Sequence, residues 1–276
     1  MLARLRELWR YRDLLRMLVI RDLKTRYKGS FLGYLWTLLN PLLMCGIFYF
    51  VFSTFARFDR PHYALELLLG ILLWNLIADS VNTSIYSIIG NASLIKKVYL
   101  PLEIFPLSVV AGVTVNFICA LPVLVAFCFI QGVYPTAGWL WLLPAALVCM
   151  LLAIALSLIV SVLAVRFKDT NHFVPVLLQV GFFASPVLYP LSEALNRLPG
   201  SIAGWLYLFN PYATWVTAAR EGMLGSVPVQ LWGETGTMLE LGAGFGVLYG
   251  MPVVFLLLAA GWVIFAAQRR RLAEYL

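Results

Sequence analysis

The chain has 276 residues, of which 62% are hydrophobic and 12% are charged, and its mean hydropathy is +0.88. Soluble domains are about 45–50% apolar and about 25% charged, so this composition excludes an ordinary water-soluble domain and predicts a chain solvated mainly by lipid. The net charge of +7 could indicate a nucleic-acid partner, but the placement of the basic residues points to a membrane instead. We expect no nucleic acid to bind.

Six segments are long and apolar enough to cross a bilayer, since a spanning helix needs about 20 mostly apolar residues. They occupy, approximately, residues 32–55, 65–89, 104–130, 139–165, 174–189 and 241–267. The remaining stretches are too short for an independent soluble domain. We therefore predict an all-α integral membrane protein with six transmembrane helices.

The lysines and arginines predict which side of the membrane each loop faces. Sixteen of the twenty lie before span one, between spans two and three, between spans four and five, or after span six. Because loops rich in Lys and Arg face the cytoplasm, we predict a multi-pass protein of a bacterial inner membrane with cytoplasmic N- and C-termini. The first apolar run is too long for a cleavable signal and lacks a small-residue cleavage site, so we expect the N-terminus to be retained.

Residues 1–30 precede the first span and carry nine basic residues. Leu8, Tyr11, Leu15 and Leu18 recur at spacings of three and four, which predicts an amphipathic helix in the inner headgroup layer, with its basic face toward anionic lipid. A solvated basic arm is the alternative, but the content of Leu, Trp and Tyr is high for a disordered segment.

Span two contains a stripe of polar residues. Asn75, Asp79, Asn82 and Tyr86 follow one another at spacings of four, three and four, which places them on one face of a helix. Polar groups in hydrocarbon are costly unless they face protein or water. The stripe therefore predicts either the lining of an aqueous pathway or hydrogen bonding between helices.

Span one contains Pro41, which should bend its helix or mark the start of its regular part. Farther along, Phe48, Phe52 and Phe55 recur at spacings of four and three. These rings either line a pathway or pack against lipid and neighbouring helices.

The link between spans two and three, approximately residues 91–101, predicts a short exposed helix. Asn91 can cap such a helix and Pro101 would end it. Between them lie Leu94, Lys96, Lys97, Val98, Tyr99 and Leu100. This mixture of apolar and basic side chains is more than a turn requires, so we predict a surface that a soluble partner grips.

The region after span five, approximately residues 191–232, contains two short apolar stretches, 202–209 and 212–223. Each is too short to cross a bilayer and too apolar for a free loop, so we predict a re-entrant or interfacial helical pair. The charged residues Arg220 and Glu221 should then lie near the outer surface or at the mouth of a pathway.

The sequence contains no constellation typical of catalysis or metal binding. His62 and His172 are expected on opposite sides of the membrane, and the four cysteines lie in apolar spans without a Cys-x-x-Cys pair. There is also no Gly-x-x-x-x-Gly-Lys-[Ser/Thr] phosphate loop. We expect no catalytic residues, metal or cofactor in this chain, and if ATP drives it, ATP and magnesium bind a partner subunit.

Several motifs, taken in order, resemble the permease subunits of type-2 ABC exporters, in the branch that moves lipid-linked polysaccharides such as O antigen, capsule and teichoic acid. Each motif is weak alone, but their joint order and spacing are specific, and they cover nearly the whole chain. They are residues 21–28, Leu32-Gly33-Tyr34-Leu35-Trp36, Asn40-Pro41, residues 96–101, Arg166-Phe167-Lys168-Asp169, Leu178-Gln179, residues 185–190, Asn210-Pro211, Arg220 and Leu224-Gly225.

This resemblance implies that residues 1–30 form the family's interface helix and that residues 91–101 form its coupling helix, which docks on an ATPase subunit. It also implies a homodimer with two ATPase copies, a re-entrant pair at the outer mouth, and a pathway lined partly by aromatic residues. For this sequence we nominate Tyr34, Trp36, Phe48 and Phe52 as pathway aromatics. The expected cargo is a lipid-linked glycan, most directly O antigen.

Three other functions compete with this interpretation. One is a type-2 ABC permease for teichoic acid, capsule, lipid or drug. Another is a membrane-bound transferase or phosphatase of lipid-linked sugars, which would need a carboxylate or histidine cluster near one interface. The third is an ion-coupled carrier, for which Asp79 is the lone candidate coupling residue and for which no internal repeat is visible.

Overall fold

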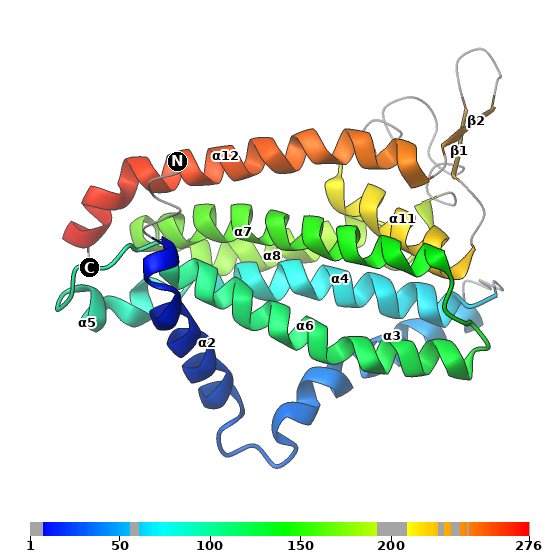
Figure 1. Cartoon of the computed structure of the whole chain (residues 1–276), viewed down its shortest axis with the longest axis horizontal. Helices are drawn as coiled ribbons and strands as arrows, with labels where there is room; N and C mark the ends of the chain where they lie inside the picture. The colour runs from blue at the N-terminus through cyan, green and yellow to red at the C-terminus, as the bar shows by residue number, and fades with distance from the viewer. Residues whose placement is uncertain are drawn as a thin grey trace.

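The computed structural model describes residues 8–55, 61–191, 209–225, 229–232, 238–241 and 243–275. Within these ranges the chain is a bundle of long helices that run roughly along one axis (Figure 1). The long helices are α3 (Trp36–Thr54), α4 (Tyr63–Ser84), α6 (Ile104–Ile130), α7 (Leu142–Arg166) and α12 (Ala243–Tyr275). The shorter ones are α2 (Arg12–Tyr27), α5 (Ala92–Ile95), α8 (Thr170–Ala184), α11 (Pro211–Leu224) and the 3-10 turns η1 (Gly33–Leu35), η2 (Ile89–Asn91) and η3 (Ala137–Trp141).

Five helical segments of the described chain are long and apolar enough to cross a membrane. They are Gly33–Thr54, Tyr63–Ser84, Ile104–Ile130, Ala137–Arg166 and Gly250–Arg269. These segments correspond to predicted spans one, two, three, four and six, and the third matches its predicted bounds. The helical membrane protein predicted from the composition is therefore confirmed, with five candidate spans rather than six.

The predicted fifth span, residues 174–189, corresponds to α8, which begins earlier, at Thr170, ends earlier, at Ala184, and is too short to cross the hydrocarbon layer alone. Its 15 residues rise about 22 Å, against a hydrocarbon thickness of about 30 Å. The helix ends because Pro186 disfavours helical geometry at the preceding residue, and Ser185 is extended with ψ at 154°. Beyond Ala184 the chain continues without regular helix to Leu191.

The end of α4 also differs from the prediction, which extended span two to residue 89. The helix stops at Ser84, and local side-chain bonds to the main chain follow it. Ser87 donates its hydroxyl proton to the carbonyl of Ser84 at 2.8 Å, and Asn91 donates from its amide to the carbonyl of Ser87 at 2.7 Å. Such bonds compete with helix formation.

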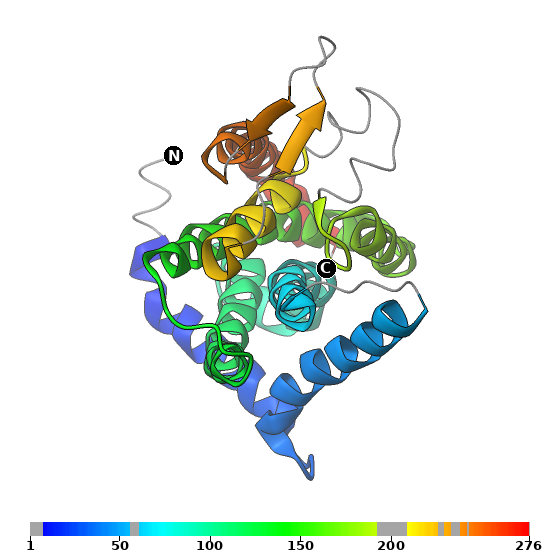
Figure 2. The same cartoon turned by 90° about the vertical axis from the view of Figure 1, so that its right-hand side faces the viewer.

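Helix α4 is the centre of the bundle, and other helices surround it when the bundle is viewed along its length (Figure 2). Within its apolar window 83% of the residues are buried, against 11% for the α3 segment and 22% for the α12 segment. The main apolar core forms around α4 from residues of α6, α7 and α11. Helices α3 and α12 therefore present most of their apolar surface outward, where lipid or another subunit would cover it.

A second, smaller core lies at the end of the bundle that carries α5. Leu18 of α2 packs there with Ile88, Phe105 of α6 and Phe265 of α12. Leu8, Tyr11 and Leu14 lie against this core as partly buried residues. The amphipathic interface helix predicted for residues 1–30 stays a prediction. We call this end of the bundle the α5 end.

Helix α11 forms part of the predicted re-entrant pair and is buried against α4, α7 and α12. The side chain of Asn210 caps it by accepting from the backbone N–H groups of Tyr212 and Ala213, and Gly225 ends it with φ at 63°. Gly138 of η3 and Gly222 meet so closely that a Cβ on either would overlap the other's backbone. The first member of the predicted pair lies almost entirely outside the described residues, so the pair itself stays a prediction.

An antiparallel pair of short strands precedes α12 and was not predicted. Strand β1 (Val229–Trp232) pairs with β2 (Met238–Leu241), with Val229 opposite Leu241. Five residues that include two glycines separate the strands in the sequence, a composition typical of hairpin connections. The all-α prediction is therefore wrong for these eight residues, which project from the end of the bundle opposite α5 (Figure 1).

Candidate functional site: a polar groove beside α4

The polar stripe of α4 lies on the one side of this helix that other helices leave open. Asp79 and Tyr86 are exposed, and Asn75 and Asn82 are partly exposed, whereas most other residues of α4 are buried. The stripe therefore does not serve only to join helices inside the core. Asn75, Asp79 and Tyr86 line a groove whose other walls come from α2, the start of α3, and α6, whereas Asn82 lines neither of its cavities.

A cavity of about 440 Å³ occupies the groove at the α5 end. We call it the basic cavity, because two arginines of α2 line it. Its lining consists of Arg21, Asp22, Leu23, Thr25, Arg26, Thr83, Tyr86, Ser87, Gly90, Asn91, Phe105, Ser108, Val109, Gly112, Val113 and Asn116. Residues from α2, from the end of α4 and from α6 thus meet at one place, although about 60 residues separate Arg26 from Tyr86 in the chain.

Farther from the α5 end, a smaller cavity of about 40 Å³ continues the groove. Asn75 and Asp79 line it together with Thr37 of α3 and Asn116 of α6. Val113 and Asn116 line both cavities, so the two adjoin. A buried water needs roughly 10–15 Å³ and two to four polar partners, so the smaller cavity has room for a few waters beside Asp79.

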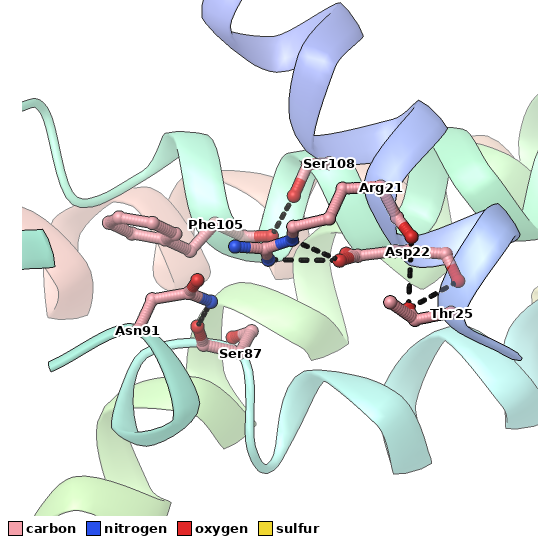
Figure 3. A network of polar contacts seen from close by, with 7 residues as sticks. All are labelled: Arg21, Asp22, Thr25, Ser87, Asn91, Phe105 and Ser108. Carbon is pink, nitrogen blue, oxygen red and sulfur yellow. Dashed lines mark hydrogen bonds and ion pairs between the residues drawn. The ribbon is translucent and has the colours of Figure 1, made fainter. Parts of the chain in front are cut away.

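The polar contacts of the basic cavity fix the position of its side chains (Figure 3). Arg21 donates to Asp22 Oδ1 from Nε at 3.0 Å and from Nη2 at 2.9 Å, and its side chain extends from α2 toward Phe105 of α6. Thr25 donates its hydroxyl proton to the carbonyls of Arg21 and Asp22, at 2.9 and 3.1 Å. Ser108 donates to the carbonyl of Phe105 at 2.8 Å.

Two long-range hydrogen bonds connect the walls of the groove. Nη2 of Arg26 donates to Oγ1 of Thr83 at 3.4 Å, which places a guanidinium one helical turn from Asp79. The hydroxyl of Tyr34 donates to Oδ1 of Asn116 at 2.9 Å. These bonds join α2 to α4, and they join η1, which leads into α3, to α6.

The aromatic residues nominated for a pathway do not gather in one place. Tyr34 reaches the groove, but Phe48 packs on the far side of α3, where its ring lies 5.7 Å from that of Phe182 in α8. Phe52 is partly buried against the main core, and Trp36 is 47% exposed. The structure thus joins Tyr34 to Asn75 and Asp79 in one groove and places Phe48 and Phe52 elsewhere.

The predicted partner-binding segment has an outer and an inner side. Lys96, Lys97, Val98 and Tyr99 are exposed, with Tyr99 at 81%, whereas Leu94 and Leu100 pack against the second core. Pro101 is buried and Asn91 is partly buried. Four of the eight nominated residues therefore remain accessible at the α5 end.

The details of this segment differ from the expected helix. Helix α5 has only four residues, and it ends at Ile95 rather than at Pro101. Asn91 occupies the predicted N-cap position, but its side chain makes no capping bond; its amide instead donates to the carbonyl of Ser87.

Arg220 lies inside the bundle near the end opposite α5, and only 4% of it is exposed. Its Nε and Nη2 both donate to the carbonyl of Glu66, at 3.1 and 2.9 Å. Nη1 donates to the carbonyl of Pro186, and Nη2 also donates to the carbonyl of Val187, each at 2.7 Å. A fifth bond runs from Nη1 to the carbonyl of Tyr189 at 3.3 Å. The guanidinium joins α11 to α4 and to the chain after α8. Arg220 is therefore a buried anchor, whereas its neighbour Glu221 is partly exposed.

Two tyrosines and a glutamate that the sequence did not single out accompany Arg220. Tyr63 donates to the carbonyl of Leu188 at 2.6 Å, and Tyr212 donates to that of Gly70 at 2.8 Å. Glu66 is buried as well. The burial of Glu66 was not evident from the sequence, because Glu66 lies at the edge of an apolar run. Its burial depends on packing against α11, which is distant in the sequence.

Five candidate spanning helices define a multi-pass membrane protein, and its bundle carries a polar groove beside α4. Residues 13–224 match the family model described as ABC-2 type transporter. The chain belongs to this family of transporter membrane subunits.

Particular members of the family are similar over most of the chain. The O-antigen export system permease protein RfbA of Klebsiella pneumoniae is 37% identical over 216 residues, which are 78% of this chain and 82% of the relative. RfbA of Myxococcus xanthus is 35% identical over 218 residues, with 79% and 83% covered. The polysialic acid transport protein KpsM of Escherichia coli is 26% identical over 216 residues, with 75% and 80% covered.

Proposed function

We propose that this chain is the membrane-spanning permease subunit of an ATP-driven exporter that moves a lipid-linked polysaccharide, most directly O antigen, across a bacterial inner membrane. The observation that carries the proposal is the similarity to permeases named for O-antigen export, which extends over more than three quarters of the chain. The lower identity to a polysialic acid transport protein makes a capsule polysaccharide the second candidate cargo.

ATP hydrolysis belongs to a separate subunit in this proposal. The accessible residues Lys96, Lys97, Val98 and Tyr99 form the docking surface, and their neighbours Leu94 and Leu100 pack on the core that contains α2 and α12. Force applied to this segment therefore reaches α2 and the groove directly. Two copies of the chain would pair with two ATPase subunits, and ATP and magnesium would bind there.

The proposed topology has six crossings and both termini in the cytoplasm. Helix α2 and the end of α12 lie at the α5 end (Figure 1), which suits termini on one side of the membrane. Helix α8 with residues 185–191 would complete the fifth crossing, and Arg220 would fix the end of that crossing to α4 at the outer side. The basic residues of the loops favour a cytoplasmic location for the α5 end.

The groove is the proposed route for the first part of the cargo. Asn75, Asp79 and Tyr34 offer amide, carboxylate and phenol groups, which form hydrogen bonds with sugar hydroxyls. These bonds would replace the hydrogen bonds to water that the sugar loses inside the membrane. Trp36, half exposed at the start of α3, would provide a stacking surface for a sugar ring, whereas Phe48 and Phe52 lie away from the groove and would not line this part of the route.

A deletion experiment tests the proposal. Cells that lack this chain should retain lipid-linked glycan inside and lose it from the surface, and a copy of the gene should restore surface glycan only when the ATPase gene is intact. Surface glycan that persists after deletion would overturn the exporter function. Accumulation of an unfinished glycan would instead indicate a transferase or phosphatase of lipid-linked sugars.

A further inference from the structure

The basic cavity lies beside the first turns of α6, a helix long and apolar enough to span a membrane. Its α6 wall runs from Phe105 to Asn116, and α6 begins at Ile104. At a rise of 1.5 Å per residue these residues extend about 17 Å from the start of a spanning helix toward its middle. Its other wall is α2, the predicted amphipathic helix, whose Leu18 packs in the second core. A ligand in this cavity would therefore have one end at the membrane surface and the other inside the bilayer.

The hydrogen-bonding groups of the cavity favour a ligand rich in acceptor oxygens. Thr25, Ser87 and Ser108 have each donated their hydroxyl proton to a main-chain carbonyl, so these hydroxyls have no proton to offer a ligand. Donors are instead available from the guanidinium groups, since Arg26 uses one N–H for Thr83 and Arg21 uses two for Asp22.

The charged residues of the basic cavity also favour a phosphate-bearing ligand. The two positive charges of Arg21 and Arg26 outnumber the one negative charge of Asp22, so the described lining has a net positive charge. Lys24 and Lys28 lie with Arg21 along an adjoining depression on α2, so the positive charge continues outside the cavity. Arginine pairs with phosphate through strong, directional hydrogen bonds.

The cavity also has the space for a headgroup. Its volume of about 440 Å³ falls within the roughly 300–1,000 Å³ typical of small-molecule sites. Gly90 and Gly112 lie in its lining, and a Cβ added to either would meet no other side chain or neighbouring backbone within 4 Å. The open space beside Gly112 makes it possible to fill the cavity from α6 without displacing a neighbouring residue.

We propose that the basic cavity binds the phosphate headgroup of a membrane lipid from the leaflet at the α5 end, with Arg26 and Arg21 contacting the phosphate oxygens. Assignment of that leaflet to the cytoplasmic side rests on the proposed function. The shared chemistry is a lipid phosphate, and two sources provide it: an anionic phospholipid, or the diphosphate of a lipid-linked cargo. In the second case the adjoining polar wall at Asn116 and Asp79 would face the first sugar units.

Binding of defined lipids to the purified full-length chain in nanodiscs tests this directly, with phosphatidylglycerol and a polyprenyl diphosphate as phosphate-bearing probes and diacylglycerol as a probe without phosphate. Retention is measured by native mass spectrometry. Arg26→Gln should weaken retention of the phosphate-bearing probe about tenfold, which is the size expected for a lost charge-assisted hydrogen bond. Gly112→Leu, which fills the cavity and leaves its charges unchanged, should also weaken retention.

Two matched controls separate the cavity from general attraction to anionic lipid. Arg16→Gln removes the same charge from an exposed position of α2 outside the cavity, and Gly46→Leu adds the same side chain to an open position on α3. Both should retain the probes like the unchanged chain. Equal losses for Arg26→Gln and Arg16→Gln, or equal retention of diacylglycerol and the phosphate-bearing probes, would overturn the proposal.

The two sources give different results, and each supports the site. Selective retention of phosphatidylglycerol would identify a phospholipid, whereas selective retention of polyprenyl diphosphate would identify the cargo headgroup. Retention is measured without transport. A deletion experiment that overturns the exporter function would therefore leave a positive binding result intact. A negative binding result would likewise leave the exporter function standing.

Discussion

The guanidinium of Arg220 in α11 lies directly against Gly70 of α4, so that a side chain at residue 70 would occupy the space that the guanidinium fills. A Cβ at that position would also come within 2.9 Å of the carbonyl oxygen of Val187. Helix α4, helix α11 and the chain after α8 thus meet at one point. The end of the bundle opposite α5 depends on a glycine to admit the cation that joins these three segments.

The variant Gly70→Ala should destabilise the chain despite the better helix propensity of alanine. The added methyl group must displace Arg220 or the backbone at Val187, and overpacking of this kind costs about 1–3 kcal/mol. A denaturant titration of the purified protein in detergent measures this loss. Gly46→Ala is the control, because its Cβ meets open space, and it should be neutral or slightly stabilising. Equal stability of the two variants would show that the contact at Gly70 has no energetic weight.

Replacement of Arg220 by methionine should destabilise the chain more severely. The change leaves the carbonyls of Glu66, Pro186 and Val187 without their donor in a buried site, and each unsatisfied group costs about 1–3 kcal/mol. Unfolding in detergent should show a loss of about 3 kcal/mol or more. The exposed cation of Lys168 provides the control, since Lys168→Met should change stability little. A mild effect of Arg220→Met would contradict the role of Arg220 as a buried anchor.

The hydrogen bond between Tyr34 and Asn116 should couple the start of α3 to α6. A double-mutant cycle with Tyr34→Phe and Asn116→Ala should give a coupling energy of about 0.5–1.5 kcal/mol in the free energy of unfolding. Export of glycan should fall in Tyr34→Phe, because the loss of this bond frees one wall of the groove. Additive effects of the two changes would show that the bond does not form in the membrane.

The exposed segment at the α5 end should bind the ATPase subunit without supporting the fold. Tyr99→Ala should reduce co-purification of the ATPase subunit about tenfold while leaving the unfolding of the isolated chain unchanged, because Tyr99 is a large exposed aromatic residue. Tyr134→Ala, at a similarly exposed tyrosine at the other end of the bundle, should have no effect on co-purification. Equal co-purification of both variants would place the ATPase contact elsewhere.

The spanning helices could be predicted closely where apolarity is continuous and no local signal interrupts it. Span three was predicted at residues 104–130 and α6 has these bounds. The prediction exceeded the helix where polar side chains bond to their own main chain after Ser84, and where Pro186 ends α8. Both signals are present in the sequence, but a continuous apolar run masked them.

The polar groove was only partly predictable. The spacing of Asn75, Asp79 and Asn82 identified one shared face of α4, but it could not identify Arg26 and Asn116 as the residues opposite that face. Those contacts depend on how α2 and α6 pack, and they join residues that lie far apart in the chain. The burial of Arg220 escaped prediction for the same reason, because its partners are main-chain carbonyls, which no side-chain pattern reveals.

The most direct test of the central claim is movement of a lipid-linked glycan across a bilayer by this chain and its ATPase subunit in sealed proteoliposomes. The ATPase subunit is oriented outward, and glycan exposed on the outside is digested by a glycosidase. With ATP, outward-facing glycan should move into the lumen and become protected from the enzyme, whereas vesicles without ATP or without this chain should show no protection. Protection that is equal with and without ATP, or that does not require this chain, would contradict the account.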